Sequence, residues 1–229
     1  MKYLLVSYLL FFSINSFSQV EESKLGSWYM YFYNVDIKES NFGIQGDVQY
    51  RNWNTLGDLE QLLLRSGVTY KPKDSSILFT LGYASITTGT PGESTATSHE
   101  NRVYQEMLFG QRMLGRVHLA HRFRYEQRWV EDQDFRTRLR YNFFINIGIN
   151  SKELLPKTFY TSFYNELFIN GERDNGISDI QLFDRNRTYF GVGYIISKSS
   201  KVQLGWMRQE TESYTKNQLQ FSLHQNLNL

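Results

Sequence analysis

Apolar and polar residues alternate along most of the chain, and the pattern is clearest from 134 to 149, which reads DFRTRLRYNFFINIGI. Arg136, Arg138 and Arg140 occupy one parity, whereas aromatic and aliphatic residues occupy the other. Because successive side chains of a β-strand point to opposite faces of the sheet, this period of two predicts a strand with one apolar and one cationic face. The pattern alone leaves open which face meets water.

The same period predicts strands over nearly the whole chain. From residue 42 onward they are expected at about 42–51, 58–71, 76–87, 100–112, 115–130, 134–149, 157–170, 184–197, 201–212 and 217–229. Tight links at 38–41, 71–75, 113–115 and 197–200 alternate with longer polar loops at 88–98 and 171–183. Short turns at one end and longer loops at the other are typical of outer-membrane barrels.

Strand length separates two barrels that would have opposite interiors. The segments 115–130 and 134–149 are far longer than the roughly 5–6 residues of a usual globular strand. They also exceed the roughly 9–11 residues that cross a bilayer at a tilt. We therefore expect an all-β, antiparallel transmembrane barrel with its apolar parity toward lipid and its arginines toward the lumen. A soluble lipid-binding barrel, with the apolar face inward, is the alternative.

The number of strands is less clear than their positions. Bacterial single-chain barrels have even strand numbers, so about ten wall strands are expected, with twelve as the alternative. The segment 26–37 (GSWYMYFYNVDI) is aromatic on both parities and is expected to tuck inside or beneath the barrel. The chain thus divides into a signal peptide at 1–18, an N-terminal aromatic segment at 19–41 leading into the barrel, and the barrel at 42–229.

The first 18 residues, MKYLLVSYLLFFSINSFS, have a basic residue, an apolar run and small residues at Ser16 and Ser18. This layout predicts export by a secretory signal peptide that is cleaved after Ser18. Cysteine is absent, which excludes disulfides, thiol catalysis and cysteine-based metal sites. The formal charge of +2 becomes +1 without Lys2, so net charge gives no argument for a nucleic-acid partner.

Charged residues on the lumen parity are the main candidate for function. This predicted lumen charge network consists of Arg51, Arg102, Arg122, Arg124, Arg128, Arg136, Arg138, Arg140, Arg185, Arg187, Asp47, Glu106, Glu126 and Glu166, together with Arg65. One interpretation is a buried network in which guanidinium groups pair with carboxylates and fill a narrow barrel. The other is a cationic pore that attracts anions. Arginines outnumber acids in this set by 11 to 4, so positive potential should remain.

Enzymatic chemistry has little support in the pattern. Ser222 and His224 share the lumen parity, but alternate residues of a strand lie about 6–7 Å apart, which suggests no direct hydroxyl–imidazole hydrogen bond. His99 beside Glu100 has no second histidine at ligand spacing. We therefore expect no catalytic residues, no metal, no cofactor and no nucleic acid.

Several strings in order along the chain resemble one family. They are DVQYRNW (47–53), NRVYQEM (101–107), HRFRYEQRW (121–129), RLRYNF (138–143), FYNELFIN (163–170) and DRNRTYFGVGY (184–194). Together they are similar to the secreted barrels grouped as the domain of unknown function 2490. The resemblance implies an outer-membrane β-barrel of a Gram-negative bacterium and brings no activity or site residues. The last segment, QLQFSLHQNLNL, resembles the alternating C-terminal signal by which such barrels are assembled.

These observations define the functional expectation. The chain is expected to be an integral outer-membrane barrel, either a narrow, porin-like, Arg-lined channel or a barrel that binds a small anionic solute. Its expected partners are outer-membrane lipids and, during biogenesis, the barrel-assembly machinery. The alternatives are an outer-membrane lipid-modifying hydrolase and a structural subunit of an outer-membrane assembly.

Overall fold

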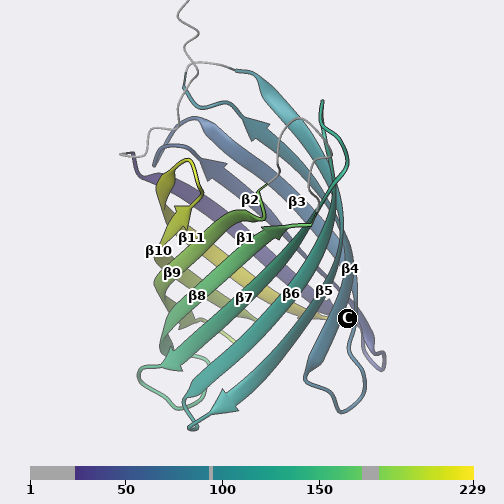
Figure 1. The fold of residues 1–229 in the computed structure, drawn as a ribbon. Helices are drawn as coiled ribbons and strands as arrows, with labels where there is room; N and C mark the ends of the chain where they lie inside the picture. The colour runs from purple at the N-terminus through teal and green to yellow at the C-terminus, as the bar shows by residue number, and fades with distance from the viewer. Residues whose placement is uncertain (1–23, 93–94, 172–180) are drawn as a thin grey trace, which may run out of the picture.

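The computed structural model describes residues 24–92, 95–171 and 181–229, so the predicted signal peptide lies outside the described residues. Within these described residues, eleven tilted strands form one closed barrel and wrap around a single interior (Figure 1). They are β1 (Gly26–Asp36), β2 (Phe42–Asn52), β3 (Leu59–Tyr70), β4 (Ile77–Gly89), β5 (Thr97–Met113), β6 (Val117–Val130), β7 (Arg136–Gly148), β8 (Phe159–Asn170), β9 (Phe183–Ile195), β10 (Ser200–Glu210) and β11 (Thr215–Asn228).

The all-β barrel expected from the sequence is confirmed, with a strand number between the ten and twelve considered. Neighbouring strands pair antiparallel, except that β1 pairs parallel with β11 and closes the barrel. The parallel seam follows from the odd number, because the first and last strands of an eleven-stranded meander run in the same direction.

The aromatic segment is therefore a wall strand, β1, and does not tuck inside or beneath the barrel. It is aromatic on both parities because each face meets aromatic or cationic neighbours. On the inside Phe32 stacks on His224, at 4.6 Å between ring centroids. On the outside Tyr29 stacks on Phe221, at 5.5 Å.

The connections fall into two sets at opposite ends of the barrel. One end, called the turn end here, carries 37–41, 71–76, 114–116, 149–158, 196–199 and the C-terminus. The other, called the loop end, carries 53–58, 131–135 and 211–214 together with the described residues that flank β4, β5, β8 and β9 there, 90–92, 95–96, 171 and 181–182. Within the described residues, no helix is long and apolar enough to cross a membrane.

Burial separates the two faces of the wall and shows which parity faces the interior. Outward-facing Leu64, Leu81 and Phe190 are 47%, 60% and 54% exposed. Arg124, Glu126 and other charged residues of the opposite parity are buried inside. The described part of the barrel thus has a polar interior and an apolar exterior, the reverse of a soluble lipid-binding barrel.

Candidate functional site in the barrel lumen

The first set of lumen charges, called the middle group, contains nearly equal numbers of each sign. Arg65 donates from Nε to Asp47 Oδ1 (2.9 Å), and Arg124 donates from Nε to Glu106 Oε2 (2.6 Å). Glu166 Oε1 accepts from Arg122 Nη2 at 2.8 Å and from Arg140 Nε at 3.0 Å. The middle group comprises Arg65, Arg122, Arg124 and Arg140 with Asp47, Glu106 and Glu166.

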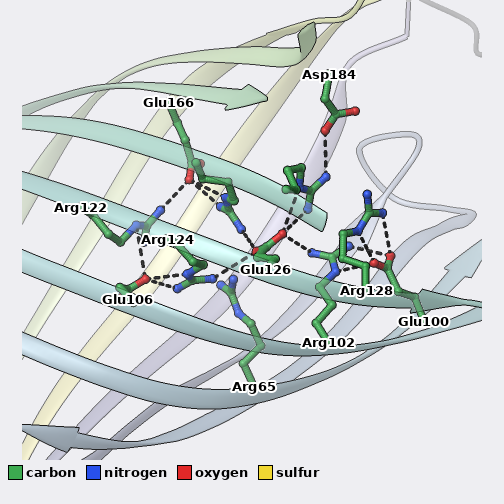
Figure 2. Close-up of polar contacts among 12 residues, drawn as sticks. Arg65, Glu100, Arg102, Glu106, Arg122, Arg124, Glu126, Arg128, Glu166 and Asp184 are labelled. Carbon is green, nitrogen blue, oxygen red and sulfur yellow. Dashed lines mark hydrogen bonds and ion pairs between the residues drawn. The ribbon is translucent and has the colours of Figure 1, made fainter. Parts of the chain in front are cut away.

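Glu126, only 1% exposed, links this group to the charges nearer the loop end (Figure 2). Its carboxylate accepts hydrogen bonds from Arg138 Nη2 and Arg140 Nη1, both at 2.6 Å. Arg102 Nη1 and Arg124 Nη1 lie 3.6 and 3.8 Å from it. Four guanidinium groups thus surround one buried carboxylate, which strengthens each interaction because the surrounding dielectric is low.

The second set, called the loop-side group, holds more cations than anions. Glu100 accepts from Arg102 Nε at 2.6 Å and also pairs with Arg128. Asp184 accepts from Arg138 Nη1 at 2.8 Å and from Arg185 Nε at 3.1 Å. The loop-side group comprises Arg51, Arg102, Arg128, Arg136, Arg138, Arg185 and Arg187 with Glu60, Glu100 and Asp184.

Two arginines of the loop-side group are buried without a carboxylate within 4 Å among the described residues. Arg51 donates instead to the amide oxygens of Gln49 and Gln61, and Arg187 donates from Nε to Gln209 Oε1 at 2.8 Å. Their guanidinium carbons lie 3.7 and 4.8 Å from the ring centroid of Trp28. The Phe168 ring lies near the guanidinium of Arg187 as well and near those of Arg138, Arg140 and Arg185. Aromatic faces attract cations but carry no compensating charge.

Arg136 is the one predicted lumen arginine that stays outside the network, since its buried Nε has no hydrogen-bond partner among the described residues. The structure brings the other predicted residues together through ion pairs with lumen carboxylates and through hydrogen bonds to Gln49, Gln61 and Gln209. The role proposed for the set remains a prediction.

Among the described residues, the lumen holds three carboxylates that are absent from the predicted network, Glu60, Glu100 and Asp184. Glu60 is the extra residue at a register shift, where Arg51 pairs with Gln61 but Asn52 pairs with Leu59. Asp184 is the extra residue where Phe168 pairs with Arg185 but Ile169 pairs with Phe183. A β-bulge puts two residues opposite one and re-aims a side chain, so each of these bulges turns a carboxylate inward against the alternation.

Glu100 was readable from the sequence, because it continues the inward parity of Arg102, Tyr104 and Glu106. The expected strand began at about residue 100, and Glu100 was considered there only as a neighbour of His99, whereas β5 already begins at Thr97. The structure places the two on opposite faces, with Glu100 in the lumen and His99 outside, where its Nδ1 is 3.2 Å from Thr87 Oγ1. Including the three missed carboxylates, the eleven lumen arginines face seven acids, not four.

The network divides the lumen into two cavities. The larger, about 240 Å³, is lined by aromatic, amide and cationic side chains and includes Phe32, Ser222 and His224 toward the turn end. The smaller, about 60 Å³, lies on the loop side, and its described lining includes eight arginines and one carboxylate, Glu100. Arg51, Arg65, Arg140 and Arg187 line both cavities and form the partition between them.

Ser222 and His224 are closer than the sequence suggested. Ser222 Oγ lies 3.0 Å from His224 Nε2, so the expectation that they are too far apart for a hydrogen bond was wrong. The Cβ atoms of alternate residues are well separated, but an imidazole ring is long enough to lean back along the strand and span the gap. The same Nε2 lies 3.2 Å from Gln203 Oε1. Gln203 donates to Ser162 through its own Nε2, so its oxygen faces the imidazole.

Fold and site together define a class: a closed eleven-stranded β-barrel with an apolar outer face and a buried arginine–carboxylate network. A family model described as "Protein of unknown function (DUF2490)" matches residues 25–220, and the chain belongs to this family. An uncharacterized protein of Methylorubrum extorquens is 30% identical over 183 residues, which cover 76% of each chain. No solved structure matches. The resemblance seen in the sequence is thereby confirmed.

Proposed function

We propose that this protein is an integral outer-membrane β-barrel whose charged interior closes the lumen to free ion flow and binds a small anionic solute. The observation that carries the proposal is the inverted burial pattern, with charge inside the barrel and apolar side chains outside. The apolar outer face supports the membrane location, and the charged inner face supports anion binding. Both faces come from the same alternation of apolar and polar residues.

The outer face supports a lipid environment. Exposed apolar side chains occur on nearly every strand, among them Val68, Leu81, Phe190 and Leu204, each more than half exposed. Soluble monomers rarely expose contiguous apolar patches larger than a few hundred Å². A closed barrel also satisfies its backbone hydrogen bonds internally, as the hydrocarbon core requires.

The interior supports binding over conduction. The ion pairs that meet at Glu126 join side chains of β5, β6 and β7, and the pairs of Glu166 extend the contact to β8. Interlocked guanidinium and carboxylate groups fill the middle of the lumen, as side chains do in narrow barrels. The excess of arginine leaves a positive potential for an anion on either side of this partition.

Refolding and fractionation test this proposal. The mature chain should insert into lipid vesicles, migrate faster on a denaturing gel before boiling than after, and fractionate with outer membranes in the producing cell. Vesicles that contain the protein should retain a trapped small anion as well as protein-free vesicles do. A chain that stays soluble after export without detergent would overturn the membrane assignment, and rapid anion release would overturn the closed lumen.

The close contact between Ser222 and His224 favours a second candidate, a hydrolase with an activated serine. The surrounding contacts weaken it, because Gln203 Oε1 is an acceptor that needs a hydrogen on His224 Nε2. An Nε2 that carries this hydrogen has no lone pair to remove the serine proton. Phospholipid turnover by the refolded protein, abolished in His224→Ala, would establish the hydrolase; an equal rate in both proteins would exclude it.

A further inference from the structure

The small cavity on the loop side holds an unusual concentration of buried positive charge. In the part of the chain that the structure describes, its walls contain eight arginines and one carboxylate, that of Glu100. Arginine stays protonated under ordinary conditions, so these side chains cannot lose their charge as a buried lysine would. Six of the eight pair with carboxylates, most of which lie outside the cavity lining, but Arg51 and Arg187 have no carboxylate within 4 Å in the described part of the chain. Leaving a buried charge without a partner is strongly destabilising, so a counter-charge beside these two arginines would be favourable.

The hydrogen bonds of Arg51 and Arg187 in this wall leave their charge uncompensated. Arg187 uses only Nε, toward Gln209, and its two terminal nitrogens find no acceptor among the described residues. Arg51 engages all three nitrogens, but its acceptors are neutral amide oxygens. Both side chains are buried, with 5% and 6% exposure, and both line the cavity. The site thus offers two cationic, preorganised side chains that do not pair with its carboxylate, because Glu100 pairs with Arg102 and Arg128.

The cavity size limits the ligand. Its volume of about 60 Å³ is a few times the roughly 10–15 Å³ of cavity that one water molecule needs. A sugar or nucleotide would not fit, whereas a small polyatomic anion would. The planar fork of arginine matches the oxygens of a phosphate or sulfate with two parallel hydrogen bonds.

We propose that this cavity is a binding site for a tetrahedral oxoanion of the phosphate class, held by Arg51 and Arg187. The inference rests on the proposed function and names its solute class and its site. The anion supplies the counter-charge that Arg51 and Arg187 lack. Two sources share this chemistry, free phosphate and a phosphomonoester of a lipid headgroup.

The experiment is a calorimetric titration of inorganic phosphate into the refolded full-length mature chain in a nonionic detergent, with chloride keeping the ionic strength constant. The wild type should bind phosphate saturably. Arg187→Gln should weaken binding at least about tenfold, because it removes a charged hydrogen-bond donor. Arg208→Gln is the matched control and should bind as the wild type does, since Arg208 is on the outer face and pairs with Glu210.

A second variant guards against a loss of binding that only reflects misfolding. Gln209→Glu keeps the shape of the side chain but places a carboxylate against Arg187 Nε. It should fold, migrate as a compact barrel and bind phosphate at least about tenfold more weakly, because the counter-charge is now built in. Phosphate binding by Gln209→Glu as tight as that of the wild type would contradict the inference.

A lipid arm identifies the source. Mixed micelles with phosphatidic acid are compared with phosphatidylcholine micelles, each with and without inorganic phosphate. Competition by phosphatidic acid indicates that the headgroup phosphomonoester can enter, and absence of competition indicates a free oxoanion; both keep the site. Heat released by phosphate that equals that of chloride would overturn the inference. If those samples still insert into vesicles and retain trapped anions, only the oxoanion site fails, and the closed membrane barrel stands.

Discussion

The middle group and the loop-side group use the same residue types in different proportions. The middle group has four arginines and three carboxylates, whereas the loop-side group has seven arginines and three carboxylates in the described part of the chain. Glu126 is shared, since two arginines of each group lie against it. In the middle group, the ion pairs fill space and lock the wall strands together. In the loop-side group, amides and aromatic rings substitute for part of the missing charge. Arginine in a lumen therefore has two roles, set by the local supply of carboxylates.

Removing the shared carboxylate should have the largest effect. Glu126→Gln leaves four guanidinium groups without their central anion, and we expect a loss of about 3–5 kcal/mol in the free energy of unfolding. Urea unfolding in lipid vesicles measures it. Glu153→Gln is the control, because its pair with Arg112 is half exposed and is worth only about 0–1 kcal/mol. Equal small losses in both variants would mean that Glu126 does not hold the middle group.

Neutralising one arginine in each group compares the two directly. Arg140→Gln strips Glu126 and Glu166 of a buried partner and should cost about 3 kcal/mol or more. Arg187→Gln should stay within about 1 kcal/mol of the wild type in phosphate-free buffer, because it loses one hydrogen bond but relieves repulsion. The same unfolding assay serves for both. If Arg187→Gln proves as costly as Arg140→Gln, the two groups do not differ as described.

A charge on the outer face extends the comparison to a third region. Leu81→Arg places a guanidinium on the apolar exterior, where we expect a loss of about 2–4 kcal/mol in vesicles. Leu56→Arg, in the exposed 53–58 loop, is the control and should be nearly neutral. If the two variants have the same free energy of unfolding in vesicles, the outer face does not contact lipid.

The smallest expected effect concerns a bulge carboxylate. Asp184→Asn removes one anion from Arg138 and Arg185, but Arg138 keeps Glu126. We expect a loss of about 1–2 kcal/mol, typical of a single hydrogen bond to a charged group. Added phosphate should recover part of this loss by supplying the counter-charge. If Asp184→Asn lowers the free energy of unfolding more than Glu126→Gln does, the ranking of the two groups is reversed.

The wall of the barrel could be predicted from the sequence, because alternation of period two is a local property. Strands such as β6 and β7, with arginine on one parity and apolar residues on the other, were placed within about two residues. Glu126 and Glu166 were assigned to the lumen by the same rule. Register is strongly specified where one face is apolar and the other charged.

The remaining features depend on long-range geometry. The wall position of β1 required its parallel partner β11, nearly two hundred residues away. Glu60 and Asp184 face inward because of bulges, which shift parity where a partner strand has one residue fewer. The contact between Ser222 and His224 depends on rotamers, on which alternation carries no information. Two of the three loop-side carboxylates, Glu60 and Asp184, therefore could not be read from the alternation.

Single-channel recording in planar bilayers tests most directly whether the middle group closes the lumen. The wild type is compared with a variant that combines Glu106→Ala, Arg124→Ala and Glu126→Ala, which empties the centre of the network. The wild type should show no stable conductance steps, whereas the variant should show them if it inserts. Steady steps of the same size from the wild type would contradict the closed lumen.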